Sequence, residues 1–269
     1  MRSAAWRVGS AVLATVLVVG LAACGDDDDD GDGDDSAGQG EQAAETDSEF
    51  CDAFVAVETT FADAPETDDP EQISSFLNDE VLPRVETVRE NLPDDPEVAD
   101  AVTTMADAVE DAAAGDLSAL QSPELQEAQA VVYPALDDIC DLQTVDVTAV
   151  DYAFEGVPET LEAGPTVFVM TNESEAGEAH EIGIARINED VDQPVEEILQ
   201  LPEEQVMEAV EFVNAVFTPE AGNVSGVVVD LTPGRYGYAC FIPVGTVGGT
   251  EGSGPPHFVE GMVGEFTVG

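Results

Sequence analysis

The sequence contains no lysine, and its six basic residues, all arginine, stand against 59 acidic ones. The resulting net charge of −53 excludes nucleic-acid binding, because phosphate contacts need a basic surface. It equally excludes direct attraction to anionic lipid headgroups. Yet 43% of the residues are hydrophobic, more than a wholly disordered acidic chain would carry. The 269 residues are therefore enough for one large folded domain or two small ones.

Enzyme signatures are also missing from the sequence. It has no G-x-S-x-G, no phosphate-binding glycine loop and no H-E-x-x-H, since His180-Glu181 is followed by Ile184 where the second histidine would stand. Carboxylates are so abundant that pairs of them say nothing about acid–base catalysis. These motifs therefore give no sign of hydrolytic or nucleotide-dependent chemistry.

The N-terminus has the pattern of an export signal. Arg2 and Arg7 precede an apolar run over residues 8–21 that is too short to span a bilayer comfortably. The sequence LAACG at 21–25 resembles the bacterial lipobox, in which the cysteine is acylated. We expect a signal peptide over 1–23 and lipidation of Cys24, which would anchor the protein at the extracytoplasmic face of the cell membrane. The alternative is an ordinary cleaved signal peptide that leaves Cys24 as a free thiol.

Residues 24–48 contain almost no apolar side chains, and eleven of residues 25–48 are acidic. Such a segment repels itself and stays extended, so we expect a disordered tether. A metal reservoir is the alternative interpretation, but an unstructured acidic run has no fixed coordination geometry.

Residues 49–143 have the apolar spacing of helices, as in Phe50, Phe54, Val57 and Phe61. Four helices are expected in this segment, with a break or kink at Pro83 in the second, and short connections predict an up-down-up-down bundle. The first and last helices of such a bundle are antiparallel. Cys51 and Cys140 then lie at the same end, and an exported protein favours a disulfide between them over two buried thiols.

Residues 144–269 instead contain short alternating strands separated by Gly and Pro turns, which predicts a β-sandwich. Strands are expected at 166–171, 180–187, 226–231, 235–242 and 261–268, besides one that begins near Val145. The segment 192–217 has a helical period and is expected to cover one end of the sandwich.

This second segment also holds both histidines of the chain and its only spare cysteine. His180 begins a predicted strand, and Cys240 lies near the end of another. His257 follows in the C-terminal loop, and Met262 comes five residues after His257. Two imidazoles, a thiolate and a thioether form the donor set of a mononuclear blue-copper site, because sulfur with imidazole suits copper in both redox states.

Residues 146–269 resemble the cupredoxins, the superfamily of plastocyanin and azurin. The resemblance rests on N-x(n)-H-E at 172–181, PGRYGYACFIP at 233–243 and PHFVEGMVGEFTV at 256–268. It implies a Greek-key sandwich with His180, Cys240, His257 and Met262 as ligands of one copper ion. A tyrosine four residues before the cysteine is also usual there, and Tyr236 matches it. For Tyr236 and Tyr238 we prefer core packing to a redox role.

The sequence departs from the small cupredoxins in one respect. Sixteen residues, five of them glycine, separate Cys240 from His257, and ordering such a loop costs conformational entropy. Three hypotheses therefore remain open: one-electron transfer at a type 1 copper site, copper carriage or sequestration by the same residues, and a metal-free interaction or structural module of the cell envelope. The redox partner of an electron carrier cannot be read from the sequence.

Overall fold

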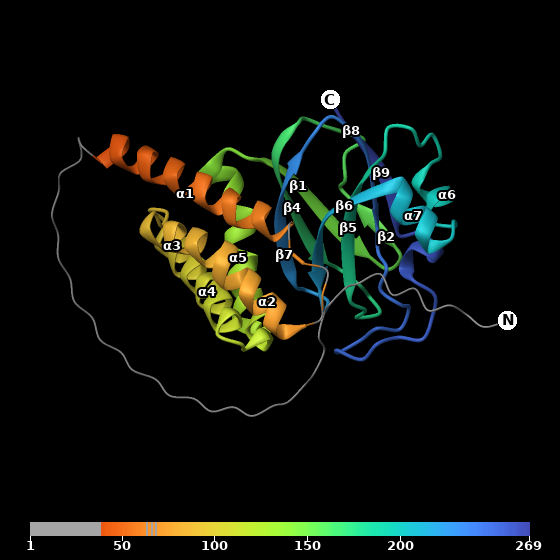
Figure 1. Ribbon diagram of the computed structural model, residues 1–269, viewed down its shortest axis with the longest axis horizontal. Coiled ribbons are helices and arrows are strands. Elements are labelled where there is room, and N and C mark those ends of the chain that lie inside the picture. The colour runs from red at the N-terminus through yellow and green to blue at the C-terminus, as the bar shows by residue number, and fades with distance from the viewer. Residues whose placement is uncertain (1–38, 63, 66, 68) are drawn as a thin grey trace.

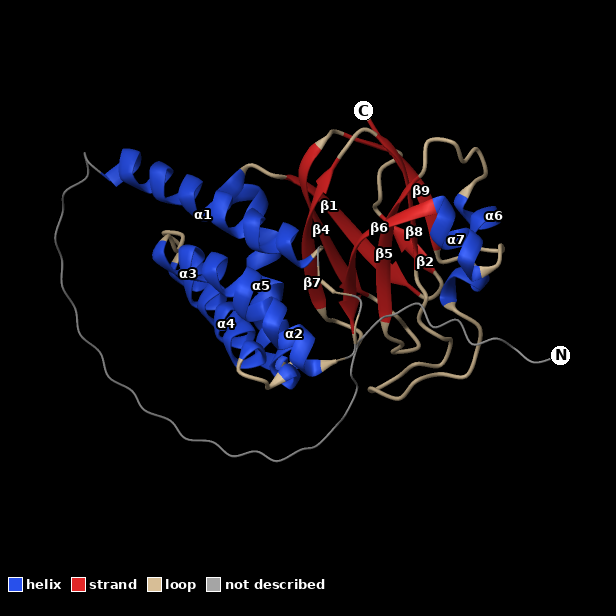
Figure 2. Ribbon diagram, viewed as in Figure 1, coloured by secondary structure: helices blue, strands red, loops and turns tan. Residues whose placement is uncertain are grey.

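The computed structural model describes residues 39–62, 64–65, 67 and 69–269. In this part of the chain a helical region is followed by two facing β-sheets (Figure 1, Figure 2), which confirms the predicted order of the two classes of structure. The predicted signal peptide, Cys24 and the first part of the predicted tether lie outside these residues. Among the helices that are described, none is both long enough and apolar enough to cross a membrane.

The helical region contains the four predicted helical segments, with two differences. The first helix starts at Gln39, ten residues before the expected boundary and inside the predicted tether. The second segment is divided by a π-helical turn that ends at Val81, two residues before Pro83, whose missing N–H removes a regular helical bond. The elements are α1 (Gln39–Phe61), α2 (Pro70–Phe76), the π turn η1 (Leu77–Val81), α3 (Leu82–Glu90), α4 (Pro96–Ala113), the 3₁₀ turn η2 (Leu117–Gln121) and α5 (Pro123–Cys140).

The sandwich has a four-stranded sheet in the order β2-β1-β4-β7 and a five-stranded sheet in the order β3-β9-β8-β5-β6. Neighbouring strands are antiparallel except for β1 with β4 and β3 with β9. The strands are β1 (Gln143–Val150), β2 (Ala153–Glu155), β3 (Thr160–Leu161), β4 (Gly164–Asn172), β5 (His180–Ile187), β6 (Val210–Thr218), β7 (Val224–Leu231), β8 (Gly234–Ala239) and β9 (Val263–Val268).

The helical prediction for 192–217 is wrong in its second half. The segment forms two short helices, α6 (Val195–Ile198) and α7 (Glu203–Ala209), and then turns into strand β6. β6 is rich in β-branched and aromatic residues and pairs along its whole length with β5 at the sheet edge. The α6–α7 part does cover the five-stranded sheet, where Val195 and Ile198 pack with Ala239.

The helical region lies against the outer face of the four-stranded sheet, with α1 and α5 next to β7 (Figure 1). Val167, Val169 and Val228 point from that sheet into the same apolar cluster as the helix residues. The predicted disulfide is confirmed: Cys51 is bonded to Cys140, with 5.6 Å between the two Cα atoms. It joins α1 to the end of α5 and so closes the region on itself.

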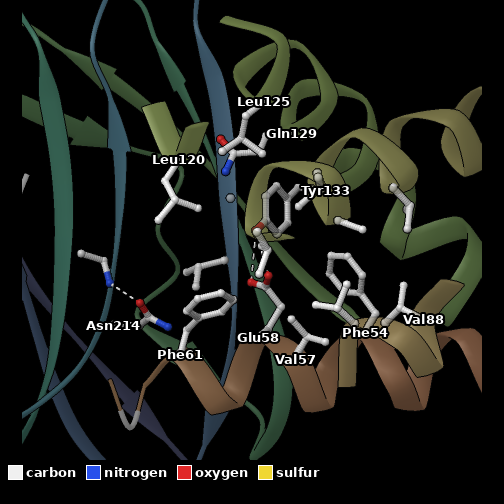
Figure 3. Close-up of a pocket in the computed structure, with 18 residues that line it drawn as sticks. Phe54, Val57, Glu58, Phe61, Val88, Leu120, Leu125, Gln129, Tyr133 and Asn214 are labelled. Atoms are coloured by element: carbon white, nitrogen blue, oxygen red, sulfur yellow. Dashed lines mark hydrogen bonds between the residues drawn. The ribbon is translucent and has the colours of Figure 1, made fainter. Parts of the chain in front are cut away.

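A buried carboxylate lies where the helices meet the sheet, beside an apolar cavity of about 230 Å³ (Figure 3). Glu58 of α1 accepts hydrogen bonds from the Tyr133 hydroxyl and from the backbone N–H of Val228, both at 3.1 Å. Burial raises the pKa of Glu58 to about 7. Because the N–H of Val228 points away from the paired strand β4, Glu58 supplies a partner that the sheet does not.

Candidate metal centre

The four residues predicted as copper ligands all lie at one end of the five-stranded sheet. His180 is the first residue of β5, and Cys240 directly follows β8. His257 opens a 3₁₀ turn, η3 (His257–Glu260), and Met262 directly precedes β9. Since β5, β8 and β9 are neighbours and β8 runs antiparallel to both, the start of β5, the end of β8 and the start of β9 meet there.

Backbone hydrogen bonds hold the last three of these residues together. The N–H of Cys240 donates to Met262 O at 3.0 Å, and the N–H of Met262 donates to His257 O at 3.1 Å. The N–H of Phe258 donates to Cys240 O at 2.9 Å. Main-chain bonds thus fix the placement of the cysteine, the histidine and the methionine independently of any side-chain ligand.

The side chains converge. His257 Nδ1 lies 3.3 Å from Cys240 Sγ and 3.1 Å from His180 Nδ1. Donor atoms of these three residues all lie within 4.8 Å of one another. Each of the three, and Met262 as well, is 0% exposed, and Met262 packs in the same core cluster as Cys240. The structure therefore brings together the group that the sequence predicted.

The long loop between Cys240 and His257 is folded back on itself. Pro243 and Pro256 form an antiparallel bridge, and the N–H of Val244 donates to Pro255 O at 2.9 Å. Farther out, the Thr246 hydroxyl donates to Pro243 O at 2.6 Å and accepts the N–H of Gly252 at 2.9 Å. Hydrogen bonds within the loop offset much of the conformational entropy lost on ordering it. His257 directly follows the residues that close the base of the loop.

The protonation states of the donors suit a metal site. Burial, followed by the charge of Glu181, raises the pKa of the Cys240 thiol to about 12, so no thiolate forms there without a compensating cation. Burial and then the charge of His257 lower the pKa of His180 to about 4, which leaves this imidazole neutral at pH 7. A bound cation would provide the charge that a buried thiolate needs. The residues present therefore fit a copper ion.

Two glutamates flank the donors, and sequence reasoning found neither. The backbone N–H of Glu181 lies 3.4 Å from Cys240 Sγ as a donor, and burial raises the pKa of its carboxyl to about 7. Glu178 Oε2 lies 2.9 Å from His257 Nε2. Burial acts against its charge, but hydrogen bonds from Gly245, His257 and Tyr152 outweigh it and lower the pKa of Glu178. Glu181 belongs to the H-E motif at 180–181, which gave it no role, and nothing in the sequence distinguishes Glu178 among 59 acidic residues.

The tyrosines on β8 serve the core, as we preferred from the sequence. Tyr236 is 1% exposed and stacks on Phe266 with ring centroids 5.1 Å apart. Its hydroxyl donates to Thr232 O at 2.9 Å and accepts the N–H of the same residue at 3.0 Å. Tyr152, for which the sequence predicted no role, instead lies edge-on to the ring of His257, with ring centroids 5.2 Å apart.

Two facing sheets carry a buried group of two histidines, one cysteine and one methionine at one end, which is the arrangement that the resemblance of the sequence to the cupredoxins implies. The donor group is the one typical of a mononuclear type 1 copper site. Each donor stands at the position that the family resemblance of the sequence assigned to it.

Comparison with solved structures found several proteins, each similar to about half of the chain. Auracyanin B has a TM-score of 0.31 at 23% identity, covering 47% of this chain and 88% of its own. Azurin from Methylomonas sp. strain J has a TM-score of 0.28 at 14% identity, and the match covers 47% of this chain and 98% of the azurin. A multicopper oxidase has a TM-score of 0.27 at 10% identity, and the match covers 47% of this chain and 44% of the oxidase. Likeness at this level carries no functional argument. No protein-family model and no curated protein matches the chain.

Proposed function

We propose that this protein binds one copper ion through His180, Cys240, His257 and Met262 and carries single electrons. The observation that carries the proposal is the buried contact of Cys240 Sγ with His257 Nδ1 at 3.3 Å, with His180 Nδ1 beside it. Copper bound there would supply a one-electron Cu(II)/Cu(I) couple. Cys240 would hold the metal as a thiolate, His180 and His257 through their imidazoles, and Met262 through its thioether.

The residues of the chain hold the site in a fixed arrangement and shield it from water. All four donors are buried, and the backbone bonds among Cys240, His257 and Met262 hold their spacing before a metal arrives. A preset site needs little rearrangement between oxidation states, which favours rapid electron transfer. Both histidines of the sequence lie in this one cluster, so this sequence has no imidazole left for a second copper centre. This supports an electron carrier rather than an oxidase.

We further propose that the protein works at the extracytoplasmic face of the cell membrane, anchored by lipid on Cys24. The proposal rests on the lipobox-like sequence at 21–25 and on the Cys51–Cys140 disulfide, a bond typical of exported proteins. Mass spectrometry of the protein from a bacterial host would test it: a diacyl-modified Cys24 at the N-terminus supports the anchor, and an unmodified thiol contradicts it.

A second candidate function is copper carriage without rapid electron exchange. The observation that favours it is the complete burial of His257, whose remote nitrogen is covered by Glu178 rather than exposed to a partner. Electron self-exchange measured on the copper-loaded protein separates the two functions. Fast exchange supports the electron carrier, whereas slow exchange with tight copper binding supports carriage.

The test of copper binding itself is the visible spectrum after addition of Cu(II) to the purified protein. We expect an intense thiolate-to-copper charge-transfer band with one equivalent bound. Cys240→Ser should abolish the band. If the wild-type protein binds no copper on dialysis, the metal-free interaction module becomes the better description of the domain.

A further inference from the structure

Glu178 links the predicted metal ligand His257 to the long loop and to a neighbouring tyrosine. Its Oε2 accepts the Nε2–H of His257 at 2.9 Å and the backbone N–H of Gly245 at 2.7 Å. Its Oε1 accepts the Tyr152 hydroxyl at 3.1 Å. The side chain is 9% exposed, so these contacts are made almost entirely out of water. One carboxylate thus has partners on three different segments of the chain.

The backbone around Glu178 is held equally firmly. Glu178 forms an antiparallel bridge with Val247 of the loop, and the N–H of Ala179 donates to Thr246 O at 2.9 Å. The Ser174 hydroxyl accepts the N–H of Glu178 at 3.0 Å. Because both the side chain and the main chain are tied, the carboxylate has little freedom to leave the imidazole.

The hydrogen bond fixes which nitrogen of His257 carries the proton. A carboxylate acceptor at Nε2 keeps the proton there, which leaves the lone pair of Nδ1 directed at Cys240 and His180. The two histidines differ in this respect, since the buried Nε2 of His180 has no hydrogen-bond partner within the described residues. The two histidines therefore differ: the Nε2 of His257 is held by the carboxylate of Glu178, whereas the Nε2 of His180 is not held by a charged group.

We propose that Glu178 is a positioning residue that sets the tautomer of His257 and favours Cu(II) over Cu(I) at this site. The redox part of the inference rests on the proposed function. A carboxylate behind an imidazole ligand raises the basicity of the ligand and adds negative charge near the metal. Both effects stabilise the more highly charged ion, so Glu178 holds the reduction potential of the site down.

The tautomer is tested on the metal-free protein by ¹⁵N NMR of the imidazoles. The chain has only two histidines, so their signals are assigned with a single His257→Gln variant. Wild-type protein should show His257 as the Nε2–H tautomer. Glu178→Ala should produce a mixture of tautomers. Glu175→Gln is the matched control. Glu175 lies three residues before Glu178 and its side chain is exposed, so this variant removes the same charge and should leave the tautomer of His257 unchanged.

The redox preference is tested by the Cu(II) and Cu(I) affinities of the same proteins. Glu178→Gln keeps an oxygen acceptor but removes the charge, and we expect it to weaken Cu(II) binding about tenfold more than Cu(I) binding. For a one-electron couple this corresponds to a reduction potential about 59 mV higher. Glu175→Gln should leave the ratio of the two affinities within about twofold of wild type.

The tautomer part and the redox part of the proposal can be overturned independently. If Glu178→Ala keeps the wild-type tautomer, the positioning role is overturned, whether or not copper binds. If Glu178→Gln and Glu175→Gln change the affinity ratio equally, the carboxylate acts only as distant charge, and the redox part is overturned. If wild-type protein shows no charge-transfer band, the proposed function fails and takes the redox part with it, while the tautomer measurement still decides the positioning role.

Discussion

Pro243 and Pro256 lie side by side in an antiparallel bridge, although residues 244–255 lie between them in the chain. The bridge closes the base of the long loop, and His257, the next residue, donates its N–H to Ile242 O at 2.9 Å. Although sixteen residues lie between them in the sequence, Cys240 Sγ and His257 Nδ1 are thereby brought to 3.3 Å from each other. The site depends on this closure more than on the length of the loop.

Thr246→Val should loosen the loop, because it removes the hydroxyl that donates to Pro243 O and accepts the N–H of Gly252. Each lost hydrogen bond costs about 1 kcal/mol of local stability. We expect faster amide hydrogen exchange over residues 244–256 and weaker copper binding. Thr250→Val is the control, since the Thr250 side chain is exposed and its backbone bonds to Val247 would remain. Equal exchange in the two variants would contradict the assigned role of Thr246.

Met262→Leu should raise the reduction potential of the copper-loaded protein, because it would remove the proposed thioether ligand while keeping an apolar side chain of similar volume. Met170→Leu is a matched control: this methionine is also 0% exposed and lies in the same core cluster. Voltammetry of the two variants separates ligation from packing. A potential that shifts equally in both would mean that Met262 is only a core residue.

Glu58→Gln should change how stability depends on pH. The pKa of Glu58 rises from 4.5 to about 7 on folding, so the folded protein retains a proton that the unfolded chain releases between these values. Wild-type stability relative to the variant should therefore fall by about 3 kcal/mol as pH rises from 4.5 to 7. Chemical denaturation across this range measures the difference. Glu181, whose pKa is also raised to about 7, is present in both proteins and cancels. A flat difference would show that Glu58 titrates normally.

Gly226→Ala should separate the helices from the sheet, because an added Cβ would lie 2.5 Å from the ring of Tyr133 and 2.9 Å from Phe168 O. Forced overpacking of this kind costs about 1–3 kcal/mol. Gly183→Ala is the comparison, since its added Cβ would meet neighbours only at 3.5 Å and beyond. Thermal unfolding should show a markedly larger loss for the first variant, and equal losses would contradict the tight contact.

The four donors could be predicted because they are rare residue types in a characteristic order. Two histidines and one spare cysteine leave little choice, and the flanking strands reveal themselves by alternation. The disulfide followed from topology, since antiparallel first and last helices place Cys51 and Cys140 at one end. Rarity and order made these predictions possible.

Glu178 and β6 could not be predicted, for two different reasons. A functional glutamate is invisible among 59 acidic residues, because its role depends on a fold that brings it to His257. The residues of β6 have apolar side chains at helical spacing, and only pairing with β5 decides in favour of a strand. The contact of the helices with the sheet was missed as well, since Glu58 and Val228 are separated by 170 residues.

The bond from the Val228 N–H to Glu58 has a consequence for how the chain is divided. β7 is an edge strand, and an uncovered edge is a template on which other chains can add strands and aggregate. Here α1 and α5 shield that edge and the valines beside it. We therefore expect a fragment starting at Gln143 to self-associate. On this expectation the helices, which carry none of the predicted metal ligands, would keep the sandwich from associating with itself.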